Sequence, residues 1–393
     1  MDMSFKWPVL DKSAEDRVLE MIRNSELSYY GNEGEVLKFE QWAKSYFGVK
    51  YALATNSGTN AILSAFFALD LKDSDIVLCQ SYTFFSSAMP FFHTKGKIAL
   101  IDSKPDEESV SVNDILTAIE QHKSVKAVSV THLYGLPCEI ELLSQRCKQK
   151  GIYLIEDCSH AHGSTYNNKL VGTFGDIGCF SFGAKKVLSG GSGGLLITND
   201  QELYERALLL GHFNKHAQER VLGANKKYWY EGLGLNNRMH PISAAIINTQ
   251  TKNLDAICRL RADMLSIINE QLSDTMLELP TTKEGYFRGA HYGFYLKLPK
   301  CYEITREDFL ERLRTLGLNL GAPQYKPLHM LPSFQSESLF VEKLVTTYED
   351  DDLPYSKCQW ERAFSIPTYT YENDIPKLKF FVNKVKQAAR SYE

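Results

Sequence analysis

The sequence predicts an α/β protein with a mostly parallel central sheet flanked by helices, followed by a smaller C-terminal α+β domain. Short apolar strands alternate with helices over roughly the first 250 residues, as expected when crossover helices join parallel strands. Beyond them, long helical stretches dominate and strands are few. The chain has 393 residues, more than one ordinary hydrophobic core accommodates. We therefore expect a large domain over residues 1–250 and a small domain over 251–393.

Each predicted element has a local signal. Residues 11–25 and 36–47 have the apolar spacing of helices, and Gly48 is placed to end the second one. The strands are short runs of aliphatic residues bounded by turn-forming residues. The predicted strands are 51–54, 75–79, 97–101, 125–131, 152–155, a strand ending at 181–182, 195–198 and 291–298. The further predicted helices are 60–69, 84–92, 112–121, 139–150, 254–272, 306–316 and 375–392.

The composition indicates an ordinary globular enzyme. Hydrophobic residues make up 44%, charged residues 23%, and the net charge is −4. Charges of both signs are interspersed, which argues against nucleic acid or an anionic membrane as a partner. The N-terminus lacks the pattern of a signal peptide, no apolar run is long enough to span a bilayer, and the eight cysteines form no CxxC pair. We expect a cytoplasmic protein that binds small molecules.

Two segments follow predicted strands, where ligands bind in parallel sheets. Residues 56–60 read Asn-Ser-Gly-Thr-Asn and open a helix, so their backbone N–H groups could bind phosphate, or Ser57 could simply cap the helix. Asp157 ends an apolar strand and could hold a protonated heterocyclic nitrogen, a metal or a ribose, or cap the next turn. His160 and His162 with Asp157 make an incomplete metal set, so we expect no metal.

A third segment places Lys185 and Lys186 between the strand ending at Ser181 and a glycine-dense loop, residues 190–194. A Walker loop would need the lysine after the glycines, so this is not one. Lysines in loops are usually solvated. A lysine enclosed by small residues beyond a strand can instead lose its proton and become a Schiff-base nucleophile.

Taken together, these segments resemble the DegT/StrS-type sugar aminotransferases, which have the fold-type-I aspartate-aminotransferase architecture. The resemblance covers nearly the whole chain, and the order and spacing of its pieces make it specific. The matching pieces are Tyr30-Gly31, Phe39-Glu40, Asn56-Ser57-Gly58-Thr59, Tyr82-Thr83-Phe84, residues 132–137, 156–194 and 234–239, and Ser365-Ile366-Pro367.

The resemblance implies pyridoxal 5′-phosphate as the cofactor. Lys186 matches the family's Schiff-base lysine, and Lys185 is its neighbour. Asp157 matches the acid that pairs with the pyridine nitrogen and keeps it protonated, so that the ring can accept electrons. Lys186 and Asp157 are the predicted catalytic residues. Phe84 matches the aromatic that stacks on the ring, and His160 stands where the family has Gln or His near the cofactor hydroxyl.

The remaining matches concern the phosphate. Gly58, Thr59 and Ser181 match phosphate ligands. Asn236 matches an asparagine that reaches the phosphate from the partner subunit, which implies a homodimer with shared active sites. Ser192 departs from the family pattern, because it replaces the acid of the usual Gly-Glu-Gly-Gly.

The implied reaction moves an amino group from L-glutamate or L-glutamine to a keto sugar, either nucleotide-linked or a keto-cyclitol, in amino-sugar biosynthesis for a polysaccharide or an antibiotic. One alternative is a pyridoxal-phosphate-dependent sugar dehydratase, but that branch of the family has His in place of the lysine. Another is a non-catalytic regulator on the same scaffold, which would be expected to lack Lys186 or Asp157. Both residues are present.

Overall fold

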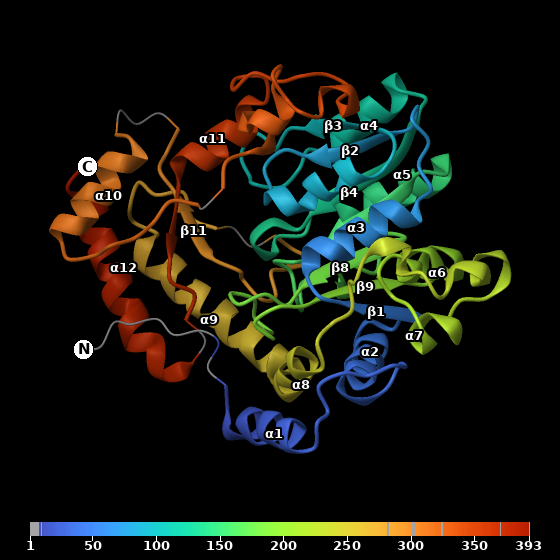
Figure 1. Ribbon diagram of the computed structural model, residues 1–393. Coiled ribbons are helices and arrows are strands. Elements are labelled where there is room, and N and C mark those ends of the chain that lie inside the picture. The colour runs from blue at the N-terminus through green and yellow to red at the C-terminus, as the bar shows by residue number, and fades with distance from the viewer. Residues whose placement is uncertain are drawn as a thin grey trace.

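A computed structural model describes residues 8, 10–280, 283–300, 304–323, 325–369 and 371–392. Its centre is a seven-stranded sheet with the strand order β1-β9-β8-β5-β4-β2-β3 (Figure 1). The strands of this sheet are β1 (Tyr51–Thr55), β2 (Ile76–Gln80), β3 (Lys97–Ile101), β4 (Val125–Thr131), β5 (Tyr153–Asp157), β8 (Ile177–Ser181) and β9 (Gly194–Thr198).

Five neighbouring strands of this sheet, β8, β5, β4, β2 and β3, pair in parallel. Strand β9 pairs antiparallel with both β8 and β1. The predicted mostly parallel sheet is therefore confirmed, with an antiparallel edge. Because parallel strands share one direction, the carboxyl ends of β2, β4, β5 and β8 meet along one edge of the sheet, where ligands bind in such folds.

Helices cover both faces of the sheet, and successive strand residues face opposite sides. Val77 and Cys79 pack in the cluster that contains α3 and α6, whereas Leu78 between them packs with α4 and α5. Helices α2 and α8 bury a further cluster against β1 and β9. The helices of this part are α1 (Lys12–Arg23), α2 (Gly34–Phe47), α3 (Gly58–Ala68), α4 (Val112–Gln121), α5 (Ile140–Lys150), α6 (Gln201–Leu209), α7 (Lys215–Gln218) and α8 (Pro241–Gln250).

The C-terminal part has its own buried cluster, formed by residues between 264 and 389. Its elements are α9 (Leu254–Leu272), α10 (Arg306–Thr315), α11 (Pro354–Arg362), α12 (Ile375–Arg390) and the antiparallel pair β11 (Phe294–Lys297) and β12 (Ala363–Ile366). A small three-stranded sheet joins β10 (Tyr286–Phe287) to β6 (Thr165–Tyr166) and β7 (Lys169–Leu170). Leu328, Phe334 and Leu344 pack in the cluster of the large sheet instead. The domain division at residue 250 stays a prediction.

Several predicted elements have the observed bounds, among them the strands 97–101 and 125–131 and the helices 112–121 and 254–272. The helix predicted over 84–92 is instead two 3-10 turns, η1 (Phe85–Ser87) and η2 (Met89–His93). Pro90 lacks a backbone N–H, so a regular helix through this segment would lose a hydrogen bond. Helices α6, α7, α8 and α11 were not predicted.

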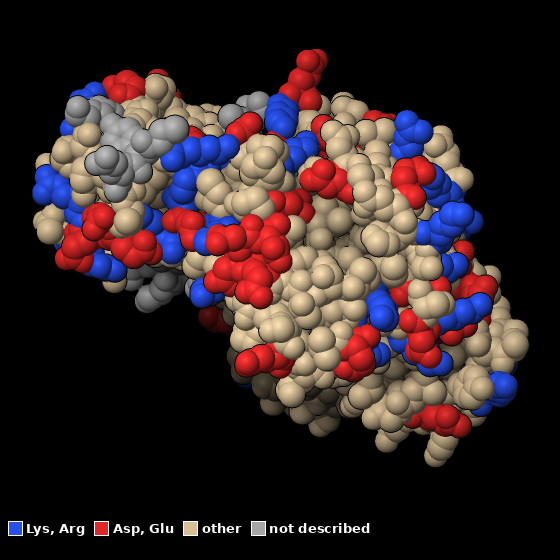
Figure 2. All heavy atoms as spheres, turned by 90° about the horizontal axis from the view of Figure 1, so that it is seen from above, with Lys and Arg blue, Asp and Glu red and all other residues tan. Residues whose placement is uncertain are grey.

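On the face seen in Figure 2, acidic and basic side chains are interspersed, and a group of acidic side chains gathers near the middle. This face has no broad basic surface of the kind that binds a nucleic-acid backbone. Among the residues that the structure describes, no helix combines the length and apolar character needed to cross a membrane.

Candidate active site

A pocket of about 260 Å³ lies at the carboxyl ends of β4, β5 and β8, beside the first turn of α3. Seven of the eight predicted cofactor-binding residues line it; the exception is Asn236. The lining residues are Gly58, Thr59, Ile62, Phe84, Ser86, Ser87, Thr131, Asp157, Ser159, His160, Ser181, Gly183, Ala184, Lys185, Lys186, Tyr292 and Tyr325. The structure therefore brings together residues that are more than 120 positions apart in the sequence.

One end of the pocket is suited to an anion. Ser57 caps α3, and its hydroxyl accepts a hydrogen bond from the Asn60 N–H at 3.2 Å. The first N–H groups of a helix have no acceptor within the helix and carry the positive end of its dipole. A side chain at Gly58 would place its Cβ 2.6 Å from the Cβ of Ser181, so only glycine lets the helix and the strand end approach this closely. Backbone donors and the Ser181 hydroxyl thus converge where a phosphate would bind.

The carboxylate of Asp157, at the end of β5, is buried in the lining of the same pocket. Its Oδ2 accepts a hydrogen bond from the Ser87 hydroxyl at 2.6 Å. Its Oδ1 accepts one from the Ser159 N–H at 3.0 Å. These two hydrogen bonds fix the orientation of the carboxylate in the pocket.

Lys186 lies in the turn after β8, where its N–H donates to the Gly183 carbonyl at 3.0 Å. Its Nζ lies 4.1 Å from the centre of the Tyr292 ring. Burial lowers the pKa of Lys186 to about 7, and the nearby Asp157 carboxylate opposes part of that decrease. An amine with this pKa is substantially neutral at physiological pH, which is the form that attacks a carbonyl carbon.

This pKa predicts how the cofactor-free protein reacts with a carbonyl compound. Covalent incorporation of pyridoxal phosphate should accelerate with pH up to about 7 and then level off, because the amine is already neutral above that pH. An ordinary exposed lysine would keep gaining reactivity up to about pH 10. Stopped-flow absorbance at a series of pH values measures the rate. A rate that still rises steeply between pH 8 and about pH 10 would contradict a lowered pKa.

An aromatic stack forms the wall behind Lys186. His160 stacks on Tyr292 with ring centres 3.8 Å apart and lies parallel to Tyr134 at 5.9 Å; Tyr134 in turn stacks on Tyr295 at 3.6 Å. The Nδ1 of His160 is buried and makes no hydrogen bond within the described part of the chain. Burial, reinforced by the positive charge of Lys186, holds the pKa of His160 well below its usual range. The ring is therefore neutral.

The aromatic lining was predicted only in part. Phe84, predicted from the sequence, borders the pocket, 37% exposed and edge-on to Tyr325 at 5.5 Å. Tyr292 and Tyr325 were missed, because they come from C-terminal segments that carry no recognisable motif. Ser87 could have been found, since it lies three residues after Phe84 in the same turn.

Asn236 lies outside this pocket. It is exposed and borders a separate pocket with Tyr29, Arg238 and His240. Its Oδ1 accepts a hydrogen bond from the Arg238 Nε at 3.2 Å. Ser192, the residue that departs from the family pattern, donates from its hydroxyl to the Asn56 carbonyl at 2.6 Å. Neither Asn236 nor Ser192 borders the pocket that contains Lys186 of the same chain.

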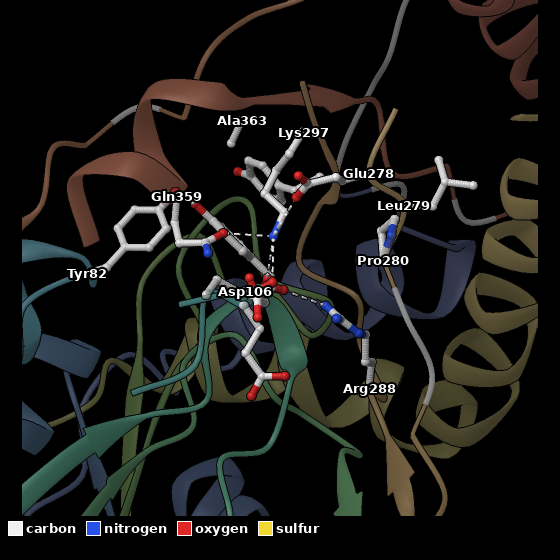
Figure 3. Close-up of a pocket in the computed structure, with 13 residues that line it drawn as sticks. Tyr82, Asp106, Glu278, Leu279, Pro280, Arg288, Lys297, Gln359 and Ala363 are labelled. Carbon is white, nitrogen blue, oxygen red and sulfur yellow. Dashed lines mark hydrogen bonds and ion pairs between the residues drawn. The ribbon is translucent and has the colours of Figure 1, made fainter. Parts of the chain in front are cut away.

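A second pocket, of about 300 Å³, lies on the far side of Tyr134 and Tyr295. Lys297 and Arg288 point toward the centre of this pocket, near Asp106 (Figure 3). Arg288 pairs with Glu108 at 3.0 Å, and Lys297 lies 3.8 Å from the same carboxylate. These ion pairs join the loop after β3 to the C-terminal part, so the charged groups are already engaged with one another. We assign the chemistry to the pocket that contains Lys186.

Within the described residues, one group of side chains has a metal-like combination, namely His132, Glu156 and Cys158. Its oxygen and nitrogen atoms have other partners. The Glu156 carboxylate accepts hydrogen bonds from the His132 Nε2 at 2.9 Å and from the N–H groups of Gly172, Phe174 and Gly175. Burial raises the pKa of the Cys158 thiol, which favours the uncharged thiol. We interpret this group as a structural support for the end of β5.

Comparison with known proteins agrees with this site. The sequence profile of the DegT/DnrJ/EryC1/StrS aminotransferase family matches residues 8–373. The chain is 29% identical over 330 residues to the GDP-perosamine synthase of Escherichia coli O157:H7, covering 84% of this chain and 86% of the relative. It is 31% identical over 305 residues to the putative pyridoxal phosphate-dependent aminotransferase EpsN of Bacillus subtilis, covering 76% of each.

A solved structure shows the same fold. The aminotransferase of Psychrobacter cryohalolentis superposes with a TM-score of 0.85 at 22% identity, covering 99% of both chains. The pocket contains groups suited to the cofactor of such enzymes, namely the N-terminus of α3 beside Ser181, a buried carboxylate, an amine with a lowered pKa and a histidine. The chain belongs to the DegT/DnrJ/EryC1/StrS aminotransferase family and is a pyridoxal-phosphate-dependent sugar aminotransferase.

Proposed function

We propose that the amino acceptor is a nucleotide-linked keto sugar and that the donor is L-glutamate or L-glutamine, in the synthesis of an amino sugar. The observation that carries the chemistry is the convergence of Lys186, Asp157 and the first turn of α3 on one pocket. The nucleotide-linked acceptor is supported by the GDP-perosamine synthases of Escherichia coli and Vibrio cholerae, which align with 84% of the chain. The keto-cyclitol acceptor has weaker support from the relatives.

Different pocket residues are assigned to the phosphate and to the ring of the cofactor. Gly58, Thr59 and Ser181 are placed to hold the phosphate, because they form the anion-binding end of the pocket. Phe84 and His160 line the same pocket, so Phe84 would stack on the ring and His160 would lie near the ring hydroxyl.

The catalytic steps need a charge and a base. Pyridoxal phosphate, when bound, supplies an electron sink for the carbanion formed at the donor Cα. The Asp157 carboxylate keeps the ring nitrogen protonated, since a negative charge beside that nitrogen favours its charged form. The Lys186 Nζ, once neutral, removes the proton from the donor Cα as a general base. The stacked tyrosines behind it exclude water from that wall of the site.

The acceptor is tested by separating the two half-reactions. Holoenzyme is treated with L-glutamate, freed of amino acid, and then offered either a GDP-linked 4-keto sugar or an inosose-type keto-cyclitol. We expect the nucleotide sugar to be aminated, detected by mass spectrometry, and the cofactor spectrum to return to its starting form. Amination of the cyclitol alone would contradict the proposal. Loss of water from the sugar without consumption of amino donor would identify a dehydratase, and no reaction of either kind would favour a regulator.

We further propose a homodimer in which Asn236 reaches the phosphate in the partner's site. Asn236 is exposed and lies outside its own chain's site. The segment before it exposes Tyr230 and Leu235, and the loop that borders the same pocket exposes Tyr30 at 73%. Clustered exposed apolar side chains indicate a protein interface. A two-fold interface would place each copy of Asn236 against the other chain.

Mixing two defective variants tests the shared site. Lys186→Ala lacks the nucleophile, and Asn236→Asp places a carboxylate beside the phosphate, where like charges repel. If sites are shared, a mixed dimer has one site with both defects and one with neither. After joint unfolding and refolding of equal amounts, activity should reach about a quarter of that of the unmodified enzyme, since half of the dimers are mixed. Mixtures no more active than the average of the parents would show that each site belongs to one chain.

A further inference from the structure

Ser87 lies in the cofactor pocket because of the turn in which it sits. It ends η1, and its N–H donates to the Phe84 carbonyl at 2.9 Å. Residues three apart in a 3-10 turn lie on the same side, so Phe84 and Ser87 both face the pocket. One short turn thus presents an aromatic ring and a hydroxyl to the same ligand.

The hydroxyl of Ser87 contacts the carboxylate of Asp157. The distance from Oγ to Oδ2 is 2.6 Å, and both side chains are buried. An ionised carboxylate has no proton to donate, so Ser87 is the donor. A hydrogen bond of this length to a charged acceptor is among the stronger kinds in proteins. The Ser159 N–H occupies the other oxygen at 3.0 Å, so both carboxylate oxygens are oriented.

Ser87 is itself held in place by neighbouring strand ends. Its Oγ lies 2.9 Å from the Thr83 hydroxyl oxygen, which lies 2.8 Å from that of Thr131. Thr131 ends β4, and its N–H donates to the side chain of Gln80, which ends β2, at 2.8 Å. The hydroxyl that contacts Asp157 is therefore connected through Thr83 to the ends of β4, the neighbour of β5, and of β2, the neighbour of β4.

We propose that Ser87 is a positioning residue that acts through Asp157, holding its carboxylate turned toward the cofactor's ring nitrogen. This inference rests on the proposed contact between Asp157 and that nitrogen. Without the Ser87 donor, a buried carboxylate oxygen would be left with one hydrogen bond fewer, and the carboxylate would no longer be held in one orientation. A carboxylate that faces the ring nitrogen less well would stabilise the protonated nitrogen less, and the ring would lose strength as an electron acceptor.

The position of that proton can be read without measuring turnover. Each variant is loaded with pyridoxal phosphate carrying ¹⁵N in the ring, and NMR at fixed neutral pH reports whether the nitrogen is protonated. Ser87→Ala should shift the equilibrium away from the protonated nitrogen by about tenfold, the usual worth of a hydrogen bond to a charged group. Ser87→Thr keeps a hydroxyl and should restore the signal. Ser64→Ala is the matched control, because the Ser64 hydroxyl is buried and makes no hydrogen bond in the described structure.

The reference variant Asp157→Asn distinguishes a failure of the role proposed for Ser87 from a failure of the proposed contact between Asp157 and the ring nitrogen. If Asp157→Asn loses the protonated signal while Ser87→Ala keeps it in full, the role of Ser87 is overturned and that of Asp157 stands. If Asp157→Asn also keeps the signal, Asp157 does not contact the nitrogen and the inference fails with it. Failure of Ser87→Ala to bind the cofactor, without recovery in Ser87→Thr, would assign Ser87 to structure alone and overturn the proposal.

Discussion

Replacing Lys186 by alanine is expected to reduce transamination by about a thousandfold or more, because the chain loses its nucleophile and its general base in one step. The pocket that remains still has its anion-binding end and the Asp157 carboxylate. The variant should therefore bind pyridoxal phosphate without forming a covalent bond to it. Equilibrium dialysis measures the binding, and the absorbance spectrum shows the missing bond.

The neighbouring lysine provides the control. Lys185 is exposed and borders the same pocket. After borohydride reduction and peptide mapping, the unmodified enzyme and Lys185→Ala should both carry the cofactor on Lys186, whereas Lys186→Ala should carry none. Label on Lys185 would reverse the assignment of the two residues.

The parts of the fold that were predicted from the sequence are those set by local pattern. Runs such as 97–101 and 125–131 are apolar, short and separated by helices, so their type and their parallel pairing follow from the chain itself. The position of β9 does not follow in this way. It inserts antiparallel between β1 and β8, and the order of strands in space depends on packing that no local pattern records.

The site residues, too, fall into those that a local motif predicts and those that only the folded chain brings to the pocket. Gly58 and Thr59, Asp157 and Lys186 each sit next to a strand end, where a sequence motif and the geometry of a parallel sheet coincide. Tyr292 and Tyr325 reach the pocket through tertiary folding of the C-terminal part, so their presence could not be read from spacing. The contact between Ser87 and Asp157 joins residues 70 positions apart, which no local motif specifies.

Asp157→Asn is expected to reduce turnover by about a hundredfold while changing cofactor loading much less. The amide has nearly the shape of the carboxylate but no charge, so the ring nitrogen loses the group that keeps it protonated and the carbanion loses its sink. The estimate matches the usual cost of removing one fixed electrostatic contact from an active site. The phosphate contacts at Gly58, Thr59 and Ser181 remain. Steady-state kinetics and a cofactor titration measure the two effects separately, and near-normal turnover of the variant would exclude the proposed role.

The same substitution has a second expected effect that does not involve turnover. The Asp157 carboxylate raises the pKa of Lys186, against the larger decrease caused by burial. Removing the negative charge leaves the burial uncompensated, so the pKa of Lys186 should fall below about 7. The rate of cofactor incorporation into the cofactor-free variant should then level off at a lower pH than in the unmodified protein. A leveling point unchanged in Asp157→Asn would show that the carboxylate does not influence the amine, and that the two catalytic residues act independently.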